Sequence, residues 1–431
     1  MSFQKSTRVL KQDVLTICGE LTDGSSPFDA QVVSYLDKMH QGLISGNNIF
    51  DISCAEPWVW AQSKYPINLS LNPPVSGTIT LSNGSAYGTF DSADISLEGR
   101  FIFIDGDSNV YKIAQHTEND QACYLDQVYL GTSGTYNYNA FKYDYDAFND
   151  IIIINSKNNA IDFSEGGSQL TANITVGSYS PDDLCIEIEN VMNAAGAESY
   201  TVSFNSITRK FTIVQGGTTF SLLFGSGTNA YISASDVLGF NVEDQTDAMT
   251  YTSEYSLSGI ARISKPITSY KNAVSYDQAA RDSNKIFMID DNTFMREFPI
   301  NRLGTAIPDK FCIVEQNRDG LWKLRFNASV QEDTRIEVNY IPIAKKLIDN
   351  VNSYPLIPGQ FSDFLVYGAA HFIQVDKSDN KAADSANKAT AQLKSLISFN
   401  RQGSQIAGNN FGKIIPRQSN LRRQWGSGST Y

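Results

Sequence analysis

The sequence predicts an α+β fold, with a helical core built from both ends of the chain and a body of antiparallel β-sheet or barrel between them. Apolar residues recur at helical spacing near the two ends, within residues 1–50 and 358–400. Between these regions, short apolar or alternating runs are separated by Gly, Pro, Asn and Asp, as in antiparallel strands joined by turns. The 21 Tyr and 24 Phe residues fit a β-rich body, because aromatic side chains favour strands.

Residues 1–50 predict a helical hairpin. In "VLKQDVLTICGEL" the apolar positions follow a helical period, which "TDGSSP" then breaks. For the second helix, Ser26 can cap the free amides, Pro27 suits the first helical position, and Asp29 favours the positive end. Gly46 should end this helix. We expect its buried stripe to be Phe28, Val32, Leu36, Met39, Leu43 and Ile44.

Residues 51–158 and 255–357 are expected to form the two parts of the β-rich body. The first part contains the strand candidates "EPWVWAQ", "YPINLSL", "SGTITLS", "GRFIFIDGDSNVYKIAQ" and "ACYLDQVYL". The fourth of these should be a hairpin that turns at residues 105–109. The second part offers "FMIDDNTFMREFPI", "KFCIVEQNRDGLWKLRFN" and "TRIEVNYIPI" as further strands or hairpins.

Residues 159–254 predict an inserted α+β domain. Strands "NAIDF" and "LTANITV" precede a helix in "SPDDLCIEIENVMNAAG", and strands "YTVSF", "KFTIV" and "TFSLLF" follow it. Ser180 can cap this helix, Pro181 suits its first turn, and Gly196 should close it. The order is therefore a β-hairpin, a helix and a β-meander.

Residues 358–400 predict a pair of helices, and residues 401–431 an extended basic arm. The helices are read from "PGQFSDFLVYGAAHFIQVD" and "NKAADSANKATAQLKSLISF". Small residues should let these two helices approach each other closely: Gly368, Ala369, Ala370, Ala382, Ala383 and Ala386. No periodicity follows Phe399, so we expect a tail from Gly403 onward.

Composition limits the function classes. A formal net charge of -12 argues against a general nucleic-acid binder, because phosphate contacts need clustered cations. The amino terminus lacks the pattern of an export signal, and no segment reaches the length of a membrane span, so we expect a protein made in a cytoplasm. The cysteines are five in number and widely spaced without a CxxC pair, which predicts reduced core thiols and neither disulfides nor a zinc site.

Two acidic runs are the candidates for chemistry. Carboxylates at alternate positions occur in "DGDSN", with Asp105, Asp107 and Asn109, and in "KYDYDAFND", with Asp144, Asp146 and Asp150. A calcium loop or a glycosidase needs such spacing, whereas a hairpin turn and a solvated edge strand are the alternatives for the first and second run.

Three histidines complete the inventory of candidate bases. His40 and His371 lie near the apolar stripes of predicted helices, where packing is the expected role, and His116 is the third. We therefore predict no catalytic constellation, no metal site and no cofactor.

The order of elements resembles the head-to-tail adaptor proteins of tailed bacteriophages, the family that includes the tail tubular A-type proteins. The similar stretches are "FDAQVVSYLDKMHQGLISGNNIFD", "PWVWAQSKYPINLSL", "YPLIPGQFSDFLVYGAAHFIQVDKSDNKAADSANKATAQL" and the arm that follows. Residues 159–254 depart from the small adaptors and look like modules that recur in phage neck and tail proteins. The alternatives are a glycan-binding protein of a tail spike or fibre and a virion glycan hydrolase, the latter resting on the Asp pairs.

The resemblance implies a structural virion protein of the neck or tail and not an enzyme, assembled in the cytoplasm of a host bacterium. It would form a homo-oligomeric ring of about twelve copies beneath the portal protein and bind tail, nozzle or fibre proteins below. Genome DNA would pass through without sequence-specific binding. The basic arm would dock on an acidic crevice of the portal, the alternative being a solvated terminus. Its predicted contact residues are Lys413, Ile414, Ile415, Arg417, Leu421, Arg422, Arg423 and Trp425.

Overall fold

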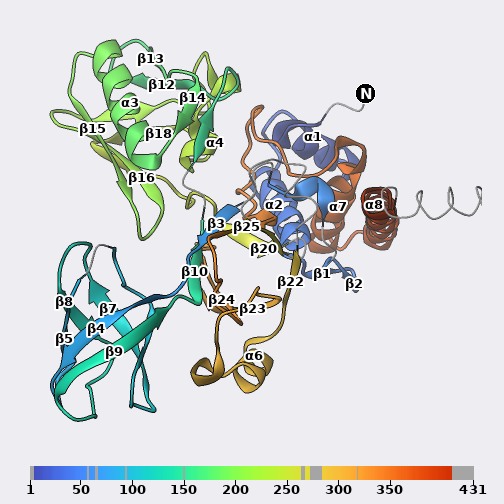
Figure 1. Ribbon diagram of the computed structural model, residues 1–431. Helices are drawn as coiled ribbons and strands as arrows, with labels where there is room; N and C mark the ends of the chain where they lie inside the picture. The colour runs from blue at the N-terminus through green and yellow to red at the C-terminus, as the bar shows by residue number, and fades with distance from the viewer. Residues whose placement is uncertain are drawn as a thin grey trace, which may run out of the picture. The chain divides into compact units, whose positions relative to one another are not determined.

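The computed structural model describes residues 4–409 except 56–57, 64–66, 93–94, 149–150, 264–266, 272–283 and 318. It confirms the α+β class, because helices accompany several antiparallel sheets and a closed barrel (Figure 1). The chain divides into two compact units. We call them the terminal unit, which comprises Met1–Gln62, Ile151–Leu257 and Ile341–Tyr431, and the barrel unit, which comprises Ser63–Asp150 and Ser258–Tyr340.

A bundle of four helices joins the two ends of the chain in the terminal unit. These helices are α1 (Thr7–Ile17), α2 (Asp29–Ser45), α7 (Asp363–Asp376) and α8 (Ala382–Asn409). Helix α7 packs against the other three and is buried along most of its length. The apolar stripes on the other helices face it, so the predicted helical core is present and α7 lies at its centre.

Helix α2 begins later than predicted. Ser26 does not cap it, because its hydroxyl accepts the Phe28 N–H at 3.2 Å and its carbonyl accepts the Asp29 N–H at 3.1 Å, which closes a turn before the helix. Gly46 ends the helix in the left-handed conformation, at φ 81°, as expected. The predicted stripe is buried at Val32, Leu36, Met39, Leu43 and Ile44, whereas Phe28 is half-buried.

The helix pair at the carboxyl end differs from expectation in two ways. Helix α8 continues to Asn409, past the predicted start of the tail, because apolar periodicity reports the burial of one face and not helicity itself. Gly368 brings α7 close to α2 and not to α8, since a Cβ atom there would lie 3.1 Å from Met39 Sδ and still closer to its methyl carbon. Ala383 is exposed and so has no part in a close approach.

The described part of "EPWVWAQ", residues 58–62, is not a strand. After the short hairpin β1 (Asn48–Ile49) and β2 (Ile52–Ser53), the chain forms the 3₁₀ turn η1 (Val59–Ala61). The buried indole of Trp58 donates from Nε1 to the Leu43 carbonyl at 2.9 Å, in the last turn of α2. A carbonyl in the last turn of a helix, which also accepts the Gly46 N–H at 3.3 Å, is therefore the partner of this aromatic segment, in place of a neighbouring strand.

Residues 151–257 of the terminal unit carry their own core, with helix α3 (Pro181–Ala195) packed on small antiparallel sheets. Ser180 caps α3 as predicted, with its hydroxyl accepting the Asp183 N–H at 3.1 Å, and Gly196 follows the last turn. The strands pair in the orders β11-β14, β13-β12-β17-β18 and β15-β16-β19. Their bounds are β11 Ile152–Ile154, β12 Ala160–Ser164, β13 Leu170–Asn173, β14 Gly177–Tyr179, β15 Tyr200–Asn205, β16 Lys210–Gln215, β17 Phe220–Leu222, β18 Gln245–Ala248 and β19 Thr250–Thr252, with η2 (Ala230–Ile232) and α4 (Ser235–Leu238) between β17 and β18.

A closed antiparallel barrel forms one half of the barrel unit, with strand order β4-β5-β8-β7-β6-β9 (Figure 1). Its strands are β4 Val75–Leu81, β5 Tyr87–Phe90, β6 Phe101–Ile104, β7 Val110–His116, β8 Ala122–Leu125 and β9 Gly134–Phe141. Alternate residues point inward and form one apolar core. The predicted hairpin is confirmed as β6 paired with β7 around residues 105–109.

A seven-stranded sheet forms the other half, in the order β10-β24-β23-β22-β21-β25-β3. Its strands are β3 Ile67–Leu71, β10 Asp144–Ala147, β21 Ile267–Lys271, β22 Asn284–Met288, β23 Lys310–Gln316, β24 Trp322–Phe326 and β25 Thr334–Val338; β20 (Ile260–Ile263) and β26 (Tyr340–Pro342) lie outside it. Strands β22 and β23 pair in parallel, contrary to the antiparallel expectation.

The parallel pair arises because "FMIDDNTFMREFPI" is not all strand. It ends β22 and then forms helix α6 (Asp291–Glu297), capped by Asp290, whose carboxylate accepts the Thr293 N–H at 2.9 Å. The 3₁₀ turn η3 (Ile300–Arg302) follows. Parallel strands need a crossover connection, and α6 with η3 supplies one here.

Candidate functional site: the terminal helices and the segment they lead into

The predicted contact residues of the arm, from Lys413 to Trp425, lie outside the described residues. The described part of the chain that leads to them is α8, a helix of 28 residues. At about 1.5 Å per residue it is roughly 40 Å long. The site is therefore built from α8 and from the contacts that fix its base.

Apolar and polar contacts together hold the first part of α8 on the bundle. Ala389, Leu393 and Leu396 are completely buried. The Ser385 hydroxyl donates to the Gln374 amide oxygen on α7 at 2.7 Å, and both side chains are buried. Buried polar pairs of this kind fix which residues face each other, because a shifted helix would leave both groups unsatisfied.

Asn400 is the last buried residue of α8 whose contacts are described. Its side-chain oxygen accepts the Val59 N–H at 2.9 Å, so the 3₁₀ turn η1 is tied to the helix. Phe399 is adjacent and packs its ring 5.3 Å from the ring of Phe361. The helical backbone continues from this anchored point to Asn409.

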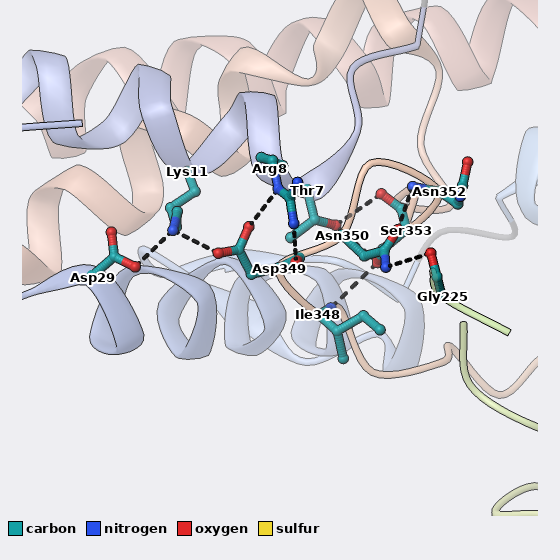
Figure 2. A network of polar contacts seen from close by, with 10 residues as sticks. All are labelled: Thr7, Arg8, Lys11, Asp29, Gly225, Ile348, Asp349, Asn350, Asn352 and Ser353. Atoms are coloured by element: carbon teal, nitrogen blue, oxygen red, sulfur yellow. Dashed lines mark hydrogen bonds and ion pairs between the residues drawn. The ribbon is translucent and has the colours of Figure 1, made fainter. Parts of the chain in front are cut away.

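A polar network joins the amino-terminal helices to the segment that precedes α7 (Figure 2). Lys11 lies at its centre, with Nζ at 2.7 Å from Asp29 Oδ2 and 2.6 Å from Asp349 Oδ2. Its side chain is only 9% exposed. Burial alone would lower the pKa of Lys11, but the hydrogen bonds to the two carboxylates outweigh it and raise the pKa above its usual value.

The same network extends on both sides of Lys11 (Figure 2). The Arg8 guanidinium contacts Asp349 twice: Nε lies 3.3 Å from the side-chain oxygen Oδ1, and Nη2 donates to the backbone carbonyl at 3.1 Å. Thr7 donates its N–H to the Ser353 carbonyl at 2.7 Å. Asn350 donates to the Gly225 carbonyl at 3.2 Å, so the inserted segment is attached to the same loop. The two ends of the chain thus form one structural element.

Sequence reasoning missed Lys11, although a signal for it was present. Lys11 occupies the buried stripe of α1 between Leu10 and Val14, where an unpaired cation would be costly. A charged residue on an apolar stripe indicates a buried partner. Its partner Asp349 lies 338 residues away, and no local pattern identifies it.

Asp144 and Asp146 occupy alternate positions of β10, which is an edge strand, and so share one of its faces, but Asp144 is not solvated. Its side chain is 5% exposed, and Arg325 binds it with two hydrogen bonds, Nε to Oδ1 at 2.6 Å and Nη2 to Oδ2 at 2.9 Å. Lys112 Nζ adds a contact to Oδ2 at 3.2 Å. Asp146 is exposed and lies 3.7 Å from Lys323. Asp150 lies outside the described residues.

The carboxylate of Asp107 serves the hairpin turn. Oδ1 accepts the backbone and side-chain N–H groups of Asn109, both at 2.9 Å, and Oδ2 accepts the Tyr111 hydroxyl at 2.8 Å. These bonds confirm the turn interpretation of residues 105–109. Across the described residues, we find no group of three or more His, Cys, Asp or Glu placed to hold a metal ion.

The histidines each bond to backbone. His40 is buried, as expected, and its Nε2 accepts the Leu356 N–H at 2.9 Å. His116 Nδ1 accepts the Leu97 N–H at 3.0 Å, and His371 Nδ1 lies 2.9 Å from the Ala382 carbonyl. All five cysteines are buried thiols, and burial raises the pKa of Cys18 and Cys123 to about 11.

A comparison with models of known protein families finds no match, and a comparison with curated proteins finds no match either. Within the described ranges, no helix combines the length and the apolar character needed to cross a bilayer.

Proposed function

We propose that this chain is a structural virion protein of a tailed bacteriophage, a head-to-tail adaptor. Copies of it would form a ring of about twelve subunits under the portal protein and would connect the portal to tail components. The carboxyl-terminal segment would bind the portal, and the acidic remainder would line a channel from which DNA is repelled.

The observation that carries this proposal is the long helix α8, which leaves an anchored base at Asn400 and leads into a segment of opposite charge to the rest of the chain. Seven of the 34 Lys and Arg residues follow Asp384, and no Asp or Glu does. The formal charge is therefore -19 up to Asp384 and +7 after it. A cationic segment with apolar anchors on an acidic body is suited to an acidic protein partner more than to DNA that must slide past.

The test is co-sedimentation with portal rings from the same phage. A chain lacking residues 410–431 keeps the whole of α8 and should fold normally, but it should no longer sediment with the portal. A chain lacking only residues 426–431 is the matched control, because it loses the same terminus but none of the predicted contact residues, and it should bind. Equal binding by both truncated chains would refute the assigned role of the segment.

A further inference from the structure

Two cations lie next to the paired ends of strands β6 and β9, at one end of the barrel. Strands β6 and β9 pair with Phe101 opposite Phe141 and Ile102 opposite Ala140. Continued by one residue, this register places Arg100 opposite Lys142. Ile102 and Ala140 belong to the core of the barrel, so alternation along the strands puts Arg100 and Lys142 on the same inner face.

Burial removes Arg100 from water almost completely and Lys142 in part. Arg100 is 3% exposed, and its Nη1 donates to the carbonyls of Pro73 at 3.0 Å and Ala140 at 3.4 Å. Lys142 is half-buried, with Nζ 5.0 Å above the ring of Tyr145. Burial lowers the pKa of both groups, and the charge of Arg100 is the second cause that lowers the pKa of Lys142.

Neither cation has a carboxylate partner among the described residues. Asp146 and Asp144 act on Lys142 only from a distance, and they are already engaged by Lys323 and by Arg325. This contrasts with Lys11, which is buried between two carboxylates.

Two physical costs are therefore only partly offset at this end of the barrel, by the two carbonyls that accept from Arg100 and by the Tyr145 ring next to Lys142. Like charges directly opposite each other on antiparallel strands are destabilising. A buried charge without a counter-charge adds a further cost. An anion bound between the two cations would offset both costs through charge-assisted hydrogen bonds.

We propose that Arg100 and Lys142 bind an oxyanion group, a carboxylate or a phosphate, at this end of the barrel. Nε and Nη2 of Arg100 donate to no group in the described part of the chain, so they can offer a two-pronged hydrogen bond to two oxygens. Lys142 supplies the second charge, and the ring of Tyr145 forms one wall. The Tyr145 hydroxyl is already used, because it accepts the Asn72 N–H at 3.3 Å.

The experiment titrates the full-length protein with inorganic phosphate and, separately, with acetate by isothermal titration calorimetry, at an ionic strength held constant with sodium chloride. Saturable binding of at least one of them is expected. Lys142→Met should weaken that binding at least tenfold, because it removes one charge-assisted contact. Lys157→Met, which removes an exposed lysine of the terminal unit, should leave it unchanged.

Each outcome decides the proposal. Binding of phosphate alone supports a phosphate-bearing ligand, and binding of acetate alone supports a carboxylate-bearing one. The proposal is overturned if neither phosphate nor acetate binds in the presence of the sodium chloride. It is also overturned if binding is unchanged in Lys142→Met. Without either anion, Lys142→Met should unfold at a temperature no lower than the wild type, because it relieves the repulsion; Lys142→Gln is the second variant if the first does not fold.

Discussion

At the scale of single residues, His40 shows how one buried ring fixes the core of the terminal unit. Its Nε2 accepts the Leu356 N–H, so the proton of the neutral ring sits on Nδ1, which is buried with no partner in the described part of the chain. A second proton would break the bond to Leu356 and bury a charge. Desolvation therefore lowers the pKa of His40 from 6.5 to about 4.

This depression predicts a loss of stability in acid. Between pH 6.5 and 4 the unfolded chain binds a proton at His40 and the folded chain does not, so the unfolding free energy falls as the pH falls. From pH 7 to 4.5 the loss should be roughly 2 to 3 kcal/mol, at about 1.36 kcal/mol per pKa unit. His40→Gln keeps an acceptor for Leu356 but does not titrate, so urea denaturation should show a flatter pH profile for it. Parallel pH profiles for the wild type and His40→Gln would show that His40 does not cause the loss of stability in acid.

Residue patterns in the sequence predicted the roles that depend on local context. The burial of His40 follows from its place on a helical stripe, and the buried thiols follow from the spacing of the cysteines. The sequence did not predict that Asp144 is buried, because its shielding comes from Arg325, 181 residues later. Ionic pairs across such separations are set by the tertiary fold alone.

At the scale of elements, the close contact between α2 and α7 depends on one glycine. Gly368 lies on α7 against Met39 of α2, and any Cβ atom there overlaps the Met39 side chain. Glycine in a helix interior costs about 1 kcal/mol relative to alanine, so its presence in the middle of α7 has a packing reason.

This contact predicts that Gly368→Ala changes the free energy of unfolding in opposite directions in the wild type and in a Met39→Ala variant. Gly368→Ala alone should destabilise the protein by about 1 kcal/mol, because overpacking costs more than helix propensity returns. In a Met39→Ala background the same change should stabilise by about 1 kcal/mol, since the new methyl group occupies vacated space. Chemical denaturation of the four chains measures this cycle. An equal effect of Gly368→Ala in both backgrounds would show that the two residues are not coupled.

The sequence predicted the elements that have a clear apolar periodicity or a local cap. It missed those that depend on tertiary contacts or are too short to show a period. The cap of α3 at Ser180 and, apart from Phe28, the stripe of α2 were predicted correctly, because both are local signals. The segment around Trp58 was read as a strand, although its indole instead binds the end of α2. Helix α6 was missed since its seven residues are too few to show a period, and only the cap at Asp290 marks it.

At the scale of the whole molecule, the α+β class and a barrel or sheet body were predictable from composition and turn spacing. The parallel pairing of β22 with β23 was not, because pairing between distant segments leaves no local trace. For the candidate site, the sequence indicates the charge of the carboxyl-terminal segment, and the structure adds the anchored helix that leads to it. The contact residues from Lys413 to Trp425 stay a prediction.

We propose that this chain forms a ring on a portal. Native mass spectrometry and electron microscopy can give the mass and symmetry of the purified protein, alone and with its portal. We expect a monomer that assembles on the portal into a ring of about twelve copies, because a heterologous interface repeated by rotation closes a ring. A stable free trimer that does not bind the portal would contradict the proposed ring and favour a tail-spike protein.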